Sequence, residues 1–323
     1  MSIKPLVTTE MVLPVLREYF DRPIRNLEVI QGGNVAQAFS FSVGSGQVEE
    51  TGEPQDFIIR FNPPMTINFE KEAYAYDKFA SPIIPIPRVI QLGRLENIFF
   101  AITEKISGRN LLQIPRPEYL ALIPKLVQVL DAIHRISIGD VPGYGIFDGM
   151  GTALTSTCKE HLELIQKEEA EGDFMGRWHV LFQNSFLEKE LFESYFFKMM
   201  DLSKYCPEER WLVHGDYGFG NILVQDGRVT AVLDWMDAQY GDFLYDVAWL
   251  DFWSPLDHWY EWFQQHYLRT ERIVPYYKER ILCWQYSITL NAMKFYAKAG
   301  SKESYQFVKD RIGFLSNQAG LSI

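Results

Sequence analysis

The period of the hydrophobic pattern changes near residue 104, and this change most constrains the fold. Before it, apolar and polar residues alternate over 39–43, and short apolar runs occupy 57–61 and 97–102, which predicts β-strands. Residues 69–80 predict a helix between these strands. After about residue 116, apolar residues recur at three- and four-residue spacing, which predicts a buried helical face over 120–133.

The later part of the chain predicts mainly helices, with one β island. Long helices are expected at 156–170, 185–202, 256–268 and 276–299. Strands are expected at 211–213, 222–224 and 229–233, with the turn Asp226-Gly227 between the last two. We therefore expect an α+β fold with two lobes: a small β-rich lobe over 1–103, a hinge over 104–108 and a larger, mainly helical lobe over 109–323.

Charge and cysteine content exclude several classes of protein. The 31 Lys and Arg residues against 42 Asp and Glu residues give a net charge of −11, which disfavours nucleic-acid binding and favours a cationic ligand. No apolar run reaches the roughly 20 residues of a membrane span, and residues 1–10 lack the pattern of a secretory signal. Cys158, Cys206 and Cys283 lie far apart, so neither a disulfide framework nor a zinc site is expected. We expect a monomeric cytoplasmic protein.

The β island carries the residues with the clearest chemistry. In the segment LVHGDYGFGNILV (212–224), Asp216 is followed five residues later by Asn221, and a second hairpin strand leads to Asp234. Phosphoryl transfer requires an oriented acceptor hydroxyl and neutralised phosphate charge. A carboxylate and a carboxamide are hard ligands for Mg²⁺, and a second carboxylate can accept the hydroxyl proton. The spacing therefore indicates phosphotransfer chemistry.

These motifs resemble the aminoglycoside phosphotransferase family. His214-Gly215-Asp216-x-x-x-x-Asn221 followed by Asp234-Trp235 is similar to its catalytic and metal-binding loops, which correspond to H-R-D-x-x-x-x-N and D-F-G of protein kinases. The resemblance implies a protein-kinase-like fold, with Asp216 as the catalytic base and Asn221 and Asp234 as Mg²⁺ ligands. It also implies that three residues of the HGD motif and the later GDFLYD segment brace the loop: His214, Asp242 and Asp246.

The resemblance extends to a nucleotide site for ATP, with GTP as an open alternative. It places a phosphate loop at Gly32, Gly33 and Asn34, and a hinge that binds the purine edge at Glu104, Lys105 and Ile106. Arg60 stands on the third strand where the family usually has Lys, and Glu72 is its expected partner. Arginine keeps the positive charge but has a fixed, bulkier fork, so the phosphate geometry at Arg60 is an open question.

The acceptor implied by the resemblance is a hydroxyl of an aminoglycoside or aminocyclitol antibiotic of the hygromycin type, which would confer resistance. Such a cationic acceptor favours an acidic and aromatic pocket. The candidate pocket residues follow the metal aspartate within thirty residues: Asp237, Trp235, Asp251, Trp253 and Glu261. Two other functions remain open at this stage. One is a same-fold kinase of a macrolide, a choline-like amine, a sugar or a homoserine-like metabolite, and the other is a nucleotide-binding pseudokinase.

Overall fold

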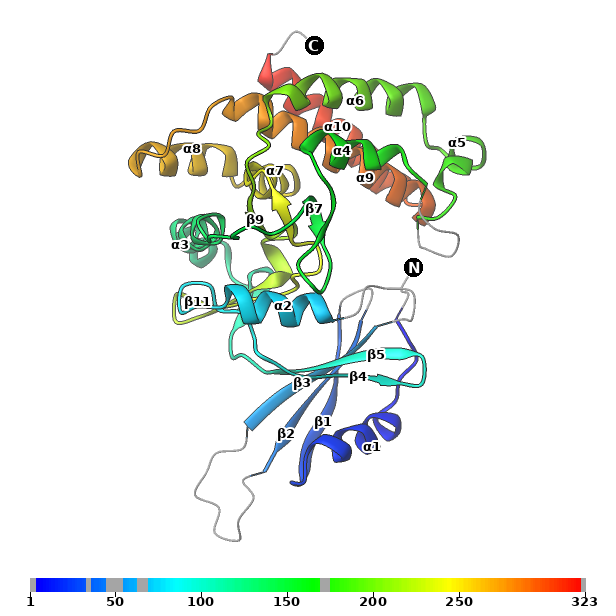
Figure 1. The fold of residues 1–323 in the computed structure, drawn as a ribbon, viewed down its shortest axis with the longest axis vertical. Helices are drawn as coiled ribbons and strands as arrows, with labels where there is room; N and C mark the ends of the chain where they lie inside the picture. Colours follow the sequence, from blue (N-terminus) through cyan, green and yellow to red (C-terminus); the bar gives the residue numbers. More distant parts are fainter. Residues whose placement is uncertain (1–3, 33–35, 45–54, 63–68, 169–174, 321–323) are drawn as a thin grey trace.

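The computed structural model describes the chain apart from residues 1–3, 33–35, 45–54, 63–68, 169–174 and 321–323. A β-sheet forms the N-terminal region and a group of helices forms the C-terminal region (Figure 1). Helix α2 (Glu70–Phe79) lies between them. The predicted α+β architecture with two regions is therefore confirmed, and α2 is the element best placed to link them.

The N-terminal sheet has five antiparallel strands in the order β1-β2-β3-β5-β4. Their bounds are β1 Ile24–Ile30, β2 Gln37–Val43, β3 Gln55–Asn62, β4 Val89–Leu95 and β5 Ile98–Glu104. Phe39, Phe41 and Phe57 are buried with Leu16 of α1 (Thr9–Tyr19) in one apolar cluster. Alternation along the strands thus places one face of the sheet against α1.

The β island forms two small sheets that carry the loops of the site. One has the strand order β11-β10-β6 and the other β8-β7-β12-β9. Their bounds are β6 Arg109–Asn110, β7 Tyr144–Phe147, β8 Ala153–Thr155, β9 Trp211–Val213, β10 Ile222–Gln225, β11 Arg228–Val232 and β12 Gln239–Gly241. The predicted island strands are therefore present, and Asp226 and Gly227 both have positive φ in the tight turn between β10 and β11.

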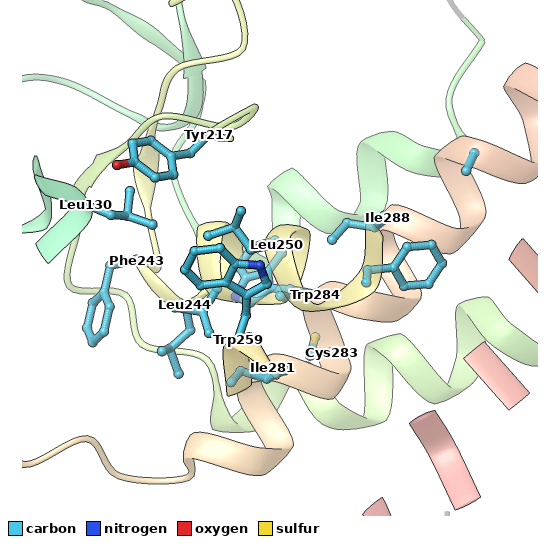
Figure 2. Packing of buried hydrophobic residues seen from close by; sticks show 14 of the residues in the cluster. Leu130, Tyr217, Phe243, Leu244, Leu250, Trp259, Ile281, Cys283, Trp284 and Ile288 are labelled. Atoms are coloured by element: carbon cyan, nitrogen blue, oxygen red, sulfur yellow. The ribbon is translucent and has the colours of Figure 1, made fainter. Parts of the chain in front are cut away.

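Helices surround this island and share one core (Figure 2). Their bounds are α3 Arg116–His134, α4 Cys158–Glu163, α5 Leu181–Asn184, α6 Lys189–Leu202, α7 Leu244–Trp253, α8 Trp259–Arg269, α9 Tyr277–Ala299 and α10 Lys302–Ala319. Leu130, Leu250, Trp259 and Trp284 bring α3, α7, α8 and α9 into contact with this core. In the described part of the chain, no helix is long and apolar enough to cross a membrane.

The structure differs from the expected elements in four places. Helix α1 contains Pro14, and it lies in a region that otherwise has the pattern of strands. Helix α7 is buried over most of its length, so it lacks the polar face that marks an amphipathic helix. The helix expected over 156–170 ends at Glu163 and continues as a single 3₁₀ turn. Helix α10 was not among the expected helices either.

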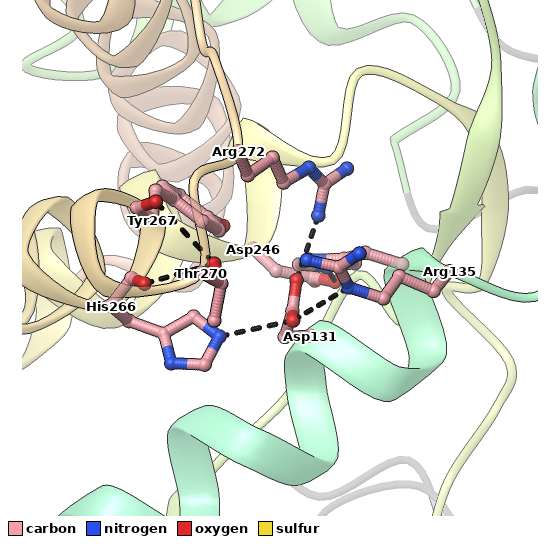
Figure 3. A network of polar contacts seen from close by, with 8 residues as sticks. Asp131, Arg135, Asp246, His266, Tyr267, Thr270 and Arg272 are labelled. Atoms are coloured by element: carbon pink, nitrogen blue, oxygen red, sulfur yellow. Dashed lines mark hydrogen bonds and ion pairs between the residues drawn. The ribbon is translucent and has the colours of Figure 1, made fainter.

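A polar network joins α3 to α8 and the segment that follows it (Figure 3). The carboxylate of Asp131 accepts hydrogen bonds from Arg135, from the His266 ring at 3.0 Å and from Arg272 at 2.8 Å. The next turn of the same helix carries His134, whose Nε2 lies 2.9 Å from Asp246. The end of α3 is therefore held against Asp246, close to the loop that carries Asp216.

A buried ion pair anchors α9 to the start of α7. The carboxylate of Asp242 accepts hydrogen bonds from the Leu244 amide at 3.0 Å, from Arg280 at 2.9 and 2.5 Å and from the Trp284 indole at 3.0 Å. The side chain of Asp242 is completely buried. Such a pair depends on both partners, because a lone buried charge is strongly destabilising.

We expect Asp242→Asn to lower the free energy of unfolding by about 3–5 kcal/mol, since it leaves Arg280 buried without its counter-charge. Urea denaturation would measure the loss. The matched control is Asp201→Asn, which removes an exposed carboxylate paired with Lys204 and should cost no more than about 1 kcal/mol. Equal losses in the two variants would contradict this role of Asp242.

Candidate active site

The loop between β9 and β10 carries Asp216 in a tightly packed backbone. Gly215 has φ of +87°, and a Cβ at this position would lie 2.1 Å from the carbonyl oxygen of Asp237. Only glycine permits that approach and that conformation together. Asp216 is therefore held directly against the loop that follows Asp234.

The ring of His214 holds the loop that carries Asp216 through two hydrogen bonds. Its Nδ1 accepts a hydrogen bond from the Asp216 amide at 3.2 Å, and its Nε2 lies 3.0 Å from the carbonyl oxygen of Leu233. Burial lowers the pKa of His214, which agrees with a neutral ring that donates from Nε2. This ring links the Asp216 loop to the strand end that delivers Asp234.

Asp246 holds the same loop by its backbone. Its two carboxylate oxygens accept hydrogen bonds from the amides of His214 and Gly215, at 2.9 and 2.8 Å, and Oδ2 also contacts His134. Both side chains of the His134–Asp246 pair are completely buried. The loop backbone therefore has little freedom around Asp216.

Asp216 and Asn221 are bonded to each other. The Asn221 amide group donates to the Asp216 carboxylate at 2.7 Å and to its carbonyl at 3.0 Å. Burial, followed by repulsion from Asp237 and Asp234, raises the pKa of Asp216 to about 7. Asp216 is thus a stronger base than an ordinary carboxylate, and the orientation of Asn221 leaves its carboxamide oxygen available as a ligand.

Asp234 follows β11 in a left-handed conformation, with φ of +59°. The Leu233 amide donates to the carbonyl of Asn221 at 2.7 Å, which holds the two loops side by side. Asn221 and Asp234 both line one cavity between the sheet and the C-terminal region, which we call the sheet-side cavity. A carboxylate and a carboxamide oxygen facing one space form a donor set for a hard divalent cation.

Arg60 and Glu72 also line the sheet-side cavity. Arg60 on β3 donates to Glu72 on α2 at 3.0 Å and makes a second, parallel bond to the same carboxylate. The expected Arg60–Glu72 partnership is therefore present in the structure. It orients the guanidinium beside Asn221 and Asp234, where phosphate groups need positive charge.

The other residues expected to bind nucleotide lie in three different places. Glu104 and Ile106 line the sheet-side cavity, whereas Lys105 pairs with Asp56, at 3.8 Å between Nζ and Oδ2. Gly32 has φ of +107°, and Gly33 and Asn34 lie outside the described residues. Of the three residues expected to bind the purine edge, Glu104 and Ile106 thus face the cavity.

A second cavity, of about 750 Å³, opens on the other side of Asp216. We call it the α9 cavity, because residues of α9 line one side of it. Its lining includes two carboxylates and several aromatic rings: Asp216, Asp237, Tyr245, Trp249, Trp253, Phe295 and Tyr296. Asp237 is exposed, so its carboxylate is accessible to a molecule in this cavity. The cavity can therefore hold a cationic, ring-shaped molecule next to Asp216.

Three residues expected in the acceptor pocket lie elsewhere. Asp251 and Glu261 line a separate cavity between α9 and α10, where Asp251 accepts a bond from Gln285 at 2.9 Å. Trp235 is buried and lines the sheet-side cavity instead, and its indole donates a hydrogen bond to the carbonyl oxygen of Val232 at 3.1 Å. The expected residues therefore do not form one acidic and aromatic pocket: Asp251 and Trp253, only two residues apart on α7, line different cavities. Asp237 and Trp253 do lie together in the α9 cavity.

Two groups near the site were missed from the sequence. Lys71, beside Glu72, is completely buried, and its ammonium group binds carbonyls of the Asp234 loop. His161 lines the α9 cavity, where burial lowers its pKa to about 4, so its ring is neutral. A lysine between two glutamates has the pattern of a solvated helix face, and no local signal marks either residue.

Comparison with known proteins agrees with this geometry. Residues 41–277 match the family described as the phosphotransferase enzyme family, APH. The hygromycin-B 4-O-kinase of Escherichia coli is 30% identical over 256 residues, which cover 78% of this chain and 69% of that kinase. A crystal structure of a thermostable mutant of aminoglycoside phosphotransferase APH(4)-Ia, in ternary complex with AMP-PNP and hygromycin B, has a TM-score of 0.78. It is 25% identical and covers 96% of this chain and 99% of its own.

A more distant structure shares the fold alone. Spectinomycin phosphotransferase APH(9)-Ia, solved with ADP and spectinomycin, has a TM-score of 0.62 at 14% identity and covers 98% of this chain and 100% of its own. The fold and the site between its two regions define a small-molecule kinase. The chain belongs to the phosphotransferase enzyme family, as the motifs around Asp216 had indicated.

We expect Asp216→Asn to lower phosphotransfer turnover by about 10²–10⁴-fold, the usual contribution of a positioned base. Asparagine keeps the size of the side chain, so thermal stability should change little. Steady-state release of the nucleoside diphosphate would measure the effect. The matched control is Asp226→Asn in the exposed β10–β11 turn, which should retain full activity. Activity of Asp216→Asn within a few-fold of the unchanged protein would refute this role.

Proposed function

We propose that this protein transfers the γ-phosphate of a nucleoside triphosphate, with Mg²⁺, to a hydroxyl of an aminoglycoside or aminocyclitol antibiotic of the hygromycin type. One observation carries the proposal. Asp216 lines the α9 cavity, and Asn221, bonded to Asp216 at 2.7 Å, lines the sheet-side cavity. The two cavities therefore meet at Asp216 and Asn221, and a phosphoryl group moving from a nucleotide in the sheet-side cavity to an acceptor in the α9 cavity would pass this pair.

The residues on either side of this pair supply the reaction. The acceptor hydroxyl lies in the α9 cavity, where the raised pKa of Asp216 suits it to accept the hydroxyl proton. The hydroxyl oxygen forms a bond to the γ-phosphorus as the bond to the β–γ bridging oxygen breaks, and the nucleoside diphosphate leaves. Arg60, oriented by Glu72, faces the phosphate charge from the sheet.

Asn221 and Asp234 would hold Mg²⁺. The donor set fits that ion, which commonly takes one or two protein ligands and completes its shell with phosphate oxygens and water. Among the described residues, no three His, Cys, Asp or Glu side chains gather into a metal site of their own. When bound, Mg²⁺ neutralises the charge on the transferred phosphate.

The nucleotide would lie in the sheet-side cavity. We assign the purine edge to the backbone of 104–106 and the phosphates to Gly32, Gly33, Asn34 and Arg60, with ATP as the donor and GTP as a second possibility. The AMP-PNP bound to APH(4)-Ia supports a nucleotide in this fold. The assignment also keeps the division into a nucleotide-binding lobe over 1–103, a hinge and a helical lobe over 109–323.

The acceptor class rests on the lining of the α9 cavity. Asp237 and the Asp216 carboxylate provide negative charge, and the indole rings of Trp249 and Trp253 contact each other edge to face at 5.7 Å between centroids. Cationic amines and sugar rings bind to such walls. The net charge of −11 would attract the same ligands. We place the protein in the cytoplasm as a monomer, where modification of the antibiotic confers resistance.

The deciding experiment measures release of ADP and of GDP by the purified protein against hygromycin B, other aminoglycosides, spectinomycin, a macrolide, choline, simple sugars and homoserine. Turnover with hygromycin B or another aminoglycoside, absent in Asp216→Asn, would support the proposal. Turnover only with another class would overturn the acceptor. Nucleotide binding without any turnover would favour a pseudokinase.

Asp234→Asn should greatly reduce the Mg²⁺ dependence of nucleotide binding. Asparagine tolerates the left-handed backbone at this position but lacks the charge that a divalent cation needs. Calorimetry with and without Mg²⁺ should show that the ion strengthens nucleotide binding at least about tenfold less in the variant. An unchanged Mg²⁺ effect would contradict the assignment of Asp234.

Asp237→Asn should raise the acceptor KM by about fivefold, since one charge-assisted contact exposed to solvent contributes about 1 kcal/mol. Its kcat should change much less. The matched control is Glu261→Gln on α8, which removes a carboxylate from the separate cavity that Asp251 also lines and should leave the acceptor KM unchanged. Equal effects of the two variants would show that long-range charge, and not the α9 cavity, selects the acceptor.

A further inference from the structure

Lys71 is a buried cation that none of the roles above uses. It lies on α2 next to Glu72 and is completely buried. Its Nζ donates to the carbonyl oxygens of Met236 and Ala238, at 2.6 Å each. The same ammonium group lies 4.5 Å from the centre of the Phe147 ring. A side chain of the N-terminal region thus bonds a loop about 165 residues later.

This arrangement is costly for a simple packing contact. Burial lowers the pKa of Lys71 to about 8, although Asp237, Asp148 and Asp234 all favour the charged form. Its direct acceptors are two neutral carbonyls, which return only part of the hydration that the ammonium group loses. An apolar side chain would fill the same space without that loss.

The two carbonyls stand on either side of Asp237, in the loop that carries both proposed ligand contacts. Asp234 faces the sheet-side cavity and Asp237 the α9 cavity. The carbonyl of Asp237 itself packs on Gly215, next to Asp216. The path of this short loop therefore decides where both carboxylates point.

Two neighbouring residues of α2 form hydrogen bonds to two different parts of the site. Glu72 binds Arg60 on β3, and Lys71 binds the 234–238 loop. Figure 1 shows α2 between the sheet and the C-terminal region. One turn of helix therefore connects the phosphate-facing arginine with the loop that carries Asp234.

We propose that Lys71 is a positioning residue: its ammonium group holds the 234–238 loop in the conformation that the two ligands require. In that conformation Asp234 faces the sheet-side cavity together with Arg60, and Asp237 faces the α9 cavity. This inference deepens the proposed function and rests on it for the identity of those ligands. Lys71 contacts neither substrate, and it acts through the backbone of the loop.

Other contacts hold α2 in place, so the role of Lys71 can be tested without removing the helix. The hydroxyl of Tyr74 bonds that of Tyr240 at 3.1 Å. The backbone at Gly149 and Gly151 approaches α2 so closely that a Cβ would lie 2.5 Å from Glu70 and 2.2 Å from Tyr74. These contacts do not depend on the ammonium group of Lys71.

The experiment compares Lys71→Met, which keeps the length without the charge, and Lys71→Gln, which keeps a neutral donor. The control is Lys78→Met, an exposed lysine of the same helix. Calorimetry measures ATP binding with and without Mg²⁺, and thermal melting measures stability. Mg²⁺ should tighten ATP binding about tenfold less in Lys71→Met than in the unchanged protein, which is the usual effect of removing a group that orients a metal ligand. We expect an intermediate effect in Lys71→Gln and no effect in Lys78→Met.

Two further readouts separate positioning from packing. A lower melting temperature with an unchanged Mg²⁺ effect in Lys71→Met would overturn the proposal, because a packing role moves stability alone. If Lys71→Met does not fold, Lys71→Gln decides the question by the same measurement: an Mg²⁺ effect within twofold of the unchanged protein would overturn the proposal, and a greater loss would support it. Because the readout is binding, failure of every acceptor to react would count against the proposed function and leave the result for Lys71 standing.

Discussion

The close placement of three carboxylates is the constraint on which the rest of this structure depends. Asp216, Asp234 and Asp237 lie near enough for their charges to act on one another: burial raises the pKa of Asp216 to about 7, and repulsion from Asp237 and Asp234 adds to this shift. Like charges held in a partly dry space repel, so the backbone that carries them must be fastened elsewhere. The buried carboxylate of Asp246 does this by binding the amides of His214 and Gly215, and Lys71 contributes a cation from α2. These contacts therefore fix the backbone that carries the carboxylates, and the ammonium group of Lys71 also offsets part of their negative charge.

The same placement divides the site into two chemical environments. On the sheet side, Arg60, Asn221 and Asp234 place charged and polar groups suited to phosphate and a hard cation in a cavity that is otherwise lined mainly by apolar side chains. On the other side, the α9 cavity combines carboxylates with aromatic rings, so it suits a cationic organic acceptor. The first environment is built from strand ends and their loops, and much of the second is contributed by α7 and α9. Helices can change their side chains without disturbing the loops, which lets one catalytic centre serve different acceptors.

Sequence reasoning succeeded in grouping residues that lie close together in the chain. Asp216, Asn221 and Asp234 were predicted as a group because a short hairpin brings them together, and the structure places them so. It failed for Asp251 and Glu261, which line a different cavity from Asp237. Helical spacing shows that residues share a face but not which of two cavities that face meets. Lys71 was missed because its partners are backbone carbonyls, which leave no trace in the residue types.

By itself, the sequence determined the class of this protein. The change in the spacing of apolar residues predicts a β-rich region followed by a helical one, and the HGDxxxxN and LDW motifs indicate phosphotransfer chemistry in the loops between strands. Those signals are local, since strand alternation and loop spacing depend on neighbours in the chain. Only the tertiary structure decided which carboxylates and rings share the α9 cavity, and that a lysine of α2 holds the loop around Asp237. Such contacts join residues far apart in sequence, and their geometry exists only once the two regions have packed together.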